Sequence, residues 1–190
     1  CERAAAEFDL NLLRVSDLIE AEVAAGTELG EEMLASLTSG KFITSTTLVE
    51  LVLKNMKATL VKNGFDGGSN NEITFVIEGF PTNTDQALAF EEATMRKPAL
   101  TLGVMDESMQ PSESAVLEMY SRRAETSEAD AGRHRSIVGG EDVPEDEAYG
   151  ALRDALTDVR VRRADQRLGD LTVVPVIGSG GGAASELCDR

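Results

Sequence analysis

Three uninterrupted apolar runs constrain the fold of this chain more than any other feature. They lie at residues 73–77, 100–105 and 171–177, and polar or turn-forming residues bound each of them. Continuous apolar runs of this length are typical of strands buried on both faces, as in a parallel sheet. Segments with helical periodicity separate the runs, at residues 84–96, 112–123 and 145–163. The alternation predicts an α/β fold with a three-layer parallel sheet.

The first third of the chain is predicted to be helical. Helices are indicated at residues 1–8, from residue 16 to Gly26, at residues 28–37 and from Ser45 onward. Ser16 and Asp17 are predicted to cap the second helix, and Gly40 to end the third. Residues 124–144 have no apolar periodicity and are predicted to form a loop.

The charge balance excludes two classes of partner. The chain carries 34 acidic and 18 basic residues, a formal net charge of −16. Sequence-independent binding to nucleic acid or to anionic lipid requires Lys and Arg to neutralise phosphates, so neither partner is expected. No apolar run is long enough to span a bilayer, and the start lacks a signal-peptide pattern. An intracellular, cytoplasmic location is therefore predicted.

The two cysteines and the first residue add little chemistry. Cys1 and Cys188 form neither a metal-binding cluster nor a disulfide framework, so no metal site is predicted. A bridge between them is the alternative. The sequence begins with Cys1 rather than Met and enters a helix at once, so we expect the natural chain to extend upstream.

Several motifs in a fixed order identify a family resemblance. Residues 16–44 read SDLIEAEVAAGTELGEEMLASLTSGKFIT, residues 75–92 read FVIEGFPTNTDQALAFEE, and residues 121–133 read SRRAETSEADAGR. They resemble, in turn, the GDLLRxEV segment, the LDGFPRxxxQAxxFE signature and the KRGETSGR lid of the adenylate kinase and UMP/CMP kinase family. Over nearly its full length the chain thus resembles a nucleoside-monophosphate kinase.

The resemblance implies an architecture and a reaction. It implies one domain over residues 1–190, with an acceptor-binding helical insertion at 16–60 and a lid-like loop at 121–143. The family's P-loop, GxPGxGKGT, would lie upstream of Cys1, so the P-loop and the first, central strand are expected to be absent from this chain. The family's reaction is phosphoryl transfer from Mg-ATP to a nucleoside monophosphate, which depends on positioned cations.

Some family positions are kept here and others are replaced. The resemblance carries nucleotide-binding roles to Asp17, Gly79 and Gln86, and Gly178 is added because it follows the last predicted strand. At other positions this chain has a different residue from the one the family has. Val15 stands in place of a threonine, and Glu20 and Thr82 stand in place of two phosphate-binding arginines. Ala151, or Ala155 in another register, stands in place of a third arginine. Glu20 inverts the charge, and two like charges about 4 Å apart repel by roughly 1 to 4 kcal/mol.

The remaining cations allow two interpretations. The resemblance gives Arg123, Arg133 and Arg135 the role of residual catalytic lid arginines, whereas in so acidic a chain they could equally form surface ion pairs. A second basic cluster, formed by Arg160, Arg162, Arg163 and Arg167, is either a docking patch for an acidic partner or one solvated helix face.

Three further side chains have a structural and a functional interpretation. Glu78 and Asp106 follow predicted strands and are interpreted as caps, with ligation of Mg²⁺-bound water as the alternative. His134 stands between two arginines in a polar segment and is expected to be solvated.

The replaced arginines favour a catalytically impaired kinase-like domain over an enzyme. Loss of one transition-state donor typically costs about 10² to 10³ in rate. The predicted role is a structural or interaction module that binds other subunits or the rest of a longer chain, for which the ciliary or flagellar axoneme is one setting. The alternative is an active kinase that uses Mg-ATP through a P-loop upstream of Cys1.

Overall fold

The computed structural model describes residues 1–64, 73–105, 114–139, 143–166 and 171–178, without the side chains at Glu145, at 160–166 and at the two ends of the last strand. The elements follow one another as α1 (Glu2–Phe8), β1 (Asn11–Arg14), α2 (Val15–Ala24), α3 (Glu28–Thr38), α4 (Ser45–Lys62), β2 (Ile73–Glu78), α5 (Thr84–Thr94), β3 (Thr101–Met105), α6 (Ala115–Thr126), β4 (His134–Val138), α7 (Glu145–Gln166) and β5 (Leu171–Gly178). All three predicted strands and the predicted helices are present.

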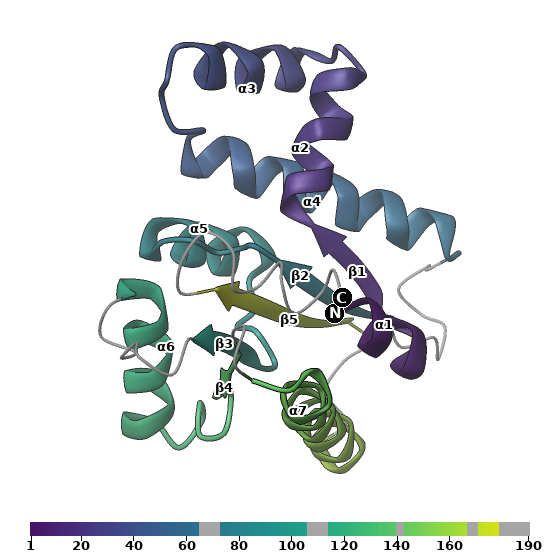
Figure 1. Ribbon diagram of the computed structural model, residues 1–190, viewed down its shortest axis with the longest axis vertical. Coiled ribbons are helices and arrows are strands. Elements are labelled where there is room, and N and C mark those ends of the chain that lie inside the picture. The colour runs from purple at the N-terminus through teal and green to yellow at the C-terminus, as the bar shows by residue number, and fades with distance from the viewer. Residues whose placement is uncertain (65–72, 106–113, 140–142, 167–170, 179–190) are drawn as a thin grey trace.

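The strands form one parallel sheet in the order β1-β2-β5-β3-β4 (Figure 1). β5 is the last strand among the described residues, yet it lies in the middle and pairs with β2 on one side and β3 on the other. The resemblance predicts that the central strand is absent, and this detail needs correction. The C-terminal strand occupies the centre.

Helices cover both faces of the sheet, which confirms the predicted three layers. On one face, Val76 and Val174 pack with α1 and α7 in a buried cluster that includes Phe8 and Leu156. On the other face, Phe75 and the alternate strand residues pack against α4 and α5. α6 adds a smaller cluster to that second face. The alternation arises because successive side chains of a strand point to opposite faces.

Helices α2, α3 and α4 form an insertion that projects from the sheet, as Figure 1 shows. α2 and α3 approach closely at Gly30, where an added Cβ would lie 2.2 Å from the Glu22 carbonyl oxygen. The buried Glu22 carboxylate accepts hydrogen bonds from Lys54 and Thr27. These bonds lower the pKa of Glu22, so a charged hydrogen-bond network ties the three helices together.

Two strands and one cap differ from the prediction. β1 was not predicted, because only two of its four residues are apolar. β4 lies inside the segment 124–144, predicted to be a loop, and only Ile137 on it is fully buried. α2 begins after Arg14 without a side-chain cap, so the predicted capping by Ser16 and Asp17 is wrong. Short edge strands carry little apolar periodicity.

Within the described residues, no helix combines the length and the apolar character that crossing a membrane requires.

Candidate functional site

The carboxyl edge of the sheet is the expected place for a ligand. All five strands are parallel, so Arg14, Glu78, Met105 and Gly178 end their strands at this same edge. The chain order reverses around the central strand β5, and ligands of open α/β sheets bind at such switch points. The predicted nucleotide-binding residues Gly178 and Gly79 therefore lie at the appropriate edge.

Arg14 is at the centre of a group of ion pairs at this edge. Its Nε donates to Glu78 Oε2 at 3.2 Å, and its Nη1 lies 2.8 Å from Glu2 Oε1 and 3.9 Å from Asp17 Oδ2. Its side chain is only 17% exposed, and that of Glu78 only 7%. Burial works to lower the pKa of Arg14, but the hydrogen bonds to Glu2 and Glu78 outweigh it and raise that pKa. The guanidinium is permanently charged and already neutralises the Glu78 carboxylate.

Sequence reasoning missed Arg14. Arg14 and Glu78 are 64 residues apart along the chain, and they become neighbours because they are register partners in β1 and β2. The interpretation of Glu78 as a cap is replaced by that of a buried ion-pair partner. Asp106, the other carboxylate considered for this edge, lies outside the described residues. No group of three potential metal-ligating side chains occurs among the residues that are described.

The corner after β2 is held by packing and by local hydrogen bonds. Gly79 adopts a φ of 76°, a conformation that favours glycine, and its N–H donates to the Val176 carbonyl of β5 at 3.2 Å. Phe80 is fully buried and meets Phe90 edge to face, with 5.4 Å between ring centroids. The corner is thus a rigid connection between β2, β5 and α5.

Gln86 and Thr82 bind each other. The buried Gln86 side-chain oxygen accepts from the Thr82 N–H at 2.8 Å and from the Thr82 hydroxyl at 3.1 Å. Asn83 caps α5 by accepting from the Gln86 N–H at 2.9 Å. The glutamine to which the resemblance gives a base-reading role therefore uses its carbonyl to fix the residue that replaces an arginine.

The other positions to which the resemblance gives a role lie on α2 and α7. Val15 is buried at the start of α2, while Asp17 and Glu20 are exposed on the same helix. On α7, Ala151 is exposed and Ala155 is fully buried in the core, so an arginine at the second position would not fit without rearrangement.

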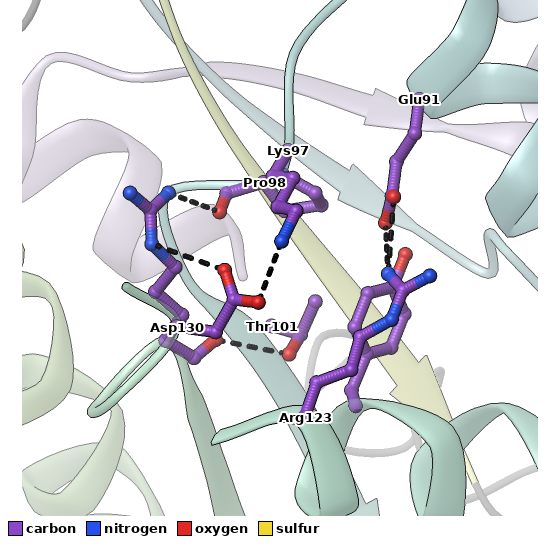
Figure 2. Close-up of a pocket in the computed structure, with 8 residues that line it drawn as sticks. Glu91, Lys97, Pro98, Thr101, Arg123 and Asp130 are labelled. Carbon is purple, nitrogen blue, oxygen red and sulfur yellow. Dashed lines mark hydrogen bonds and ion pairs between the residues drawn. The ribbon is translucent and has the colours of Figure 1, made fainter. Parts of the chain in front are cut away.

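The predicted lid arginines lie at the opposite edge of the sheet. Arg123 lies in the last turn of α6, and Arg133 immediately precedes β4, at the amino ends of β3 and β4. Both line a pocket together with Glu91, Lys97, Pro98, Thr101, Tyr120 and Asp130 (Figure 2). Arg135 is exposed on β4 and pairs with Asp158 of α7. The structure thus does not bring these arginines together with Asp17, Gly79 and Gln86.

His134 belongs to the same amino edge. It is partly buried, and its Nδ1 lies 3.0 Å from the Thr101 hydroxyl, so the expectation of a solvated side chain is wrong. Burial lowers its pKa, and the attraction of Glu125 only partly compensates. The side chains of the other basic cluster, at residues 160–167, lie outside the described set.

Because β5 is the central strand, the glycine-rich run that follows it can be compared with a P-loop. The sequence reads GSGGGAAS at residues 178–185, directly after the strand. A P-loop follows its strand with the spacing GxxxxGK[ST]. Gly178 and Ser185 fit the first and last positions of that spacing, whereas Ala183 and Ala184 stand at its glycine and lysine. Residues after Gly178 lie outside the described part, so this match concerns the sequence alone.

Comparison with known proteins finds relatives of two activities. UMP-CMP kinase 2 of Oryza sativa subsp. japonica is 31% identical over 102 residues, which cover 54% of this chain and 37% of that protein. Adenylate kinase 1 of Schistosoma mansoni is 29% identical over 73% of this chain and 62% of its own length. An adenylate kinase of Agrobacterium fabrum is 25% identical over 86% of this chain and 72% of its own length. No family model matches the chain.

The similar stretches thus span less than two thirds of the first relatives' own lengths. The parallel sheet flanked by helices agrees with a P-loop kinase-like fold. On these grounds the chain is similar to nucleoside-monophosphate kinases of two kinds, the adenylate kinases and the UMP-CMP kinases.

Proposed function

We propose that this adenylate-kinase-like domain has lost phosphoryl transfer and serves as a structural or interaction module of a larger protein or assembly. The observation that carries the proposal is the buried Arg14–Glu78 pair at the carboxyl edge. Arg14, a cation at the expected phosphate edge, is committed to protein carboxylates. The two positions that the resemblance assigns to phosphate-binding arginines, Glu20 and Thr82, supply no cation.

Electrostatics explains why this arrangement opposes catalysis. Phosphoryl transfer requires cations that stabilise the charge of the transferred group in the transition state. An incoming phosphate would have to compete with Glu2 and Glu78 for Arg14, and breaking a buried pair leaves an uncompensated charge at a cost of about 3 to 5 kcal/mol. Each lost donor is expected to cost about 10² to 10³ in rate.

The glycine-rich run supports the same proposal. If residues 178–185 follow β5 as a P-loop follows its strand, the phosphate-binding lysine position is Ala184. Glycine-rich backbone alone offers amide N–H groups to a phosphate but no side-chain charge. Mg-ATP is therefore not expected to be a cofactor of this domain.

The alternative is an active nucleoside-monophosphate kinase that uses Mg-ATP with a separate P-loop upstream of Cys1. The observation that favours it is the corner at Gly79 and Gln86, where the sequence keeps the glycine and the glutamine of the motif that it resembles. A natural chain with an intact GxPGxGKGT upstream would favour this alternative.

The setting of the module is part of the same proposal. The strongly acidic surface favours protein partners with basic surfaces, and we place the domain in a large assembly such as a ciliary or flagellar axoneme. Fluorescence localisation of the full natural protein tests this setting, and a diffuse signal excluded from cilia would contradict it.

Calorimetric titration of AMP, CMP and UMP into the full chain tests the loss of the acceptor site. We expect the natural sequence to show no measurable nucleotide binding. We expect the double variant that combines Glu20→Arg with Thr82→Arg to bind the nucleotides measurably. The matched control, Glu31→Arg with Thr38→Arg, adds the same charge to exposed positions of α3 and is expected to gain nothing. Micromolar binding by the natural sequence would contradict the proposal.

A further inference from the structure

A pocket opens at the amino edge of the sheet, away from the site discussed above. It is a shallow, open pocket that lies between the ends of α5 and α6 and the starts of β3 and β4. Its floor is buried, because Pro98, Thr101 and Tyr120 are almost fully covered. The mouth is more exposed, since the Lys97 side chain is 51% and that of Arg123 30% accessible. Small-molecule sites commonly combine a buried floor with a few polar groups.

The pocket is locally cationic in an acidic protein. Its lining holds the three cations Lys97, Arg123 and Arg133 and the two carboxylates Glu91 and Asp130. Lys97 Nζ lies 2.6 Å from Asp130 Oδ2, and Figure 2 shows this amine directed at Asp130. Three positive and two negative groups leave one positive charge, against −16 for the whole chain. Among the lining residues, the balance of charge therefore favours an anion over a cation.

The two arginines keep donors available toward the pocket. Arg133 donates through Nε to the Ala129 carbonyl at 2.9 Å and through Nη1 to the Pro98 carbonyl at 3.2 Å. Its Nη2 has no partner among the described residues. Arg123 donates through Nη1 to both oxygens of Glu91, at 2.9 and 3.0 Å, and neither its Nε nor its Nη2 has a hydrogen-bond partner in the described part of the chain.

The guanidinium groups are held in place by these contacts. Main-chain carbonyls fix Arg133, and Glu91 and the Tyr120 ring, 5.8 Å from the Arg123 guanidinium carbon, fix Arg123. Immobilised guanidinium groups bind oxyanions with little further loss of side-chain entropy. The Lys97 ammonium has three donors and spends one on Asp130, so it can turn toward an added anion.

We propose that this pocket binds a small oxyanion, a phosphate or a carboxylate group, through Arg133, Arg123 and Lys97. The apolar sides of Pro98 and Tyr120 would contact the body of a ligand that carries such a group. The site is independent of the proposed function, because it lies at the opposite edge of the sheet from Gly79 and Gln86.

Backbone amide chemical shifts of the full chain, titrated with inorganic phosphate, test the site. A parallel titration with acetate distinguishes a phosphate from a carboxylate preference, and sodium chloride at matched ionic strength serves as the blank. Saturable shifts at Lys97, Thr101 and Arg133 with either anion, and none with chloride, are expected. Shifts that scatter over the surface without saturation, or that centre on Gly79 and Gln86, would overturn the assignment.

Variants locate the donors. Arg133→Gln is expected to weaken binding by about tenfold or more, the effect of one charge-assisted hydrogen bond. Arg153→Gln is the matched control, because Arg153 is half exposed on α7 and pairs with Glu7 outside the pocket. Equal affinities of Arg133→Gln and the natural sequence would contradict the proposal. The shift map of the natural sequence decides the question even if a variant fails to fold.

Discussion

The two edges of the sheet use their arginines differently. At the carboxyl edge, the Arg14 side chain is only 17% exposed and is surrounded by the carboxylates of Glu2, Asp17 and Glu78. At the amino edge, Arg123 and Arg133 are each about 30% exposed and donate partly to main-chain carbonyls or to a single acid. A buried cation with saturated partners stabilises a fold, whereas a half-exposed cation in a pocket can still bind something. The edge that resembles a phosphate site is the one where the cation is least available.

Replacing Arg14 is expected to have the largest effect on stability. Arg14→Ala leaves Glu78 buried without its partner, which costs about 3 to 5 kcal/mol of unfolding free energy in comparable buried pairs. Arg122→Ala, whose exposed side chain pairs with Glu118 one helical turn away, is the control and should change stability by less than about 0.5 kcal/mol. Urea unfolding of both variants measures the difference. Equal midpoints would mean that Arg14 is not part of a buried network.

An intermediate effect is expected at the amino edge. Lys97→Met removes the nearest partner of the buried Asp130 and, among the described side chains, leaves Arg133 at 3.8 Å as its cation. An under-partnered buried acid costs about 1 to 3 kcal/mol, which urea unfolding can resolve. Adding Asp130→Asn in the same chain should restore most of the loss, because the neutral amide needs no counter-charge. A double variant as unstable as the single one would contradict this pairing.

The smallest effect is a pH dependence that originates at the amino edge. Burial lowers the pKa of His134 below its ordinary value of 6.5 in the folded state. As the pH falls from about 7 to about 5, the unfolded chain therefore takes up a proton before the folded chain does, and stability decreases. The natural sequence should lose urea resistance over this range, and His134→Gln should lose less. A rise in stability toward low pH would reverse the sign and refute the assignment.

The sequence was informative where structure is local and uninformative where it depends on distant neighbours. The runs at 73–77 and 171–177 predicted β2 and β5, because each strand is buried on both faces and needs apolar residues throughout. Nothing in those runs indicates that β5 lies between β2 and β3. β4 escaped prediction because it is an edge strand with one fully buried residue, Ile137.

The candidate sites show the same division. A turn after β2 could be predicted from the sequence Gly79-Phe80-Pro81, since a glycine with positive φ and a buried Phe80 are local requirements. The ion pair between Arg14 and Glu78 could not, because it depends on the register of two strands. The amino-edge pocket is likewise assembled from separate segments, so the lid resemblance named Arg123 and Arg133 but not their surroundings.

Phosphoryl transfer from Mg-ATP to AMP, CMP and UMP by the full natural protein tests the central claim most directly. The account predicts no turnover above background for the natural protein. The variant Arg122→Ala, which changes only an exposed side chain, is the control and is also expected to show no turnover. Turnover near that of ordinary nucleoside-monophosphate kinases would contradict it, and would mean that cations other than Arg14 serve the carboxyl edge.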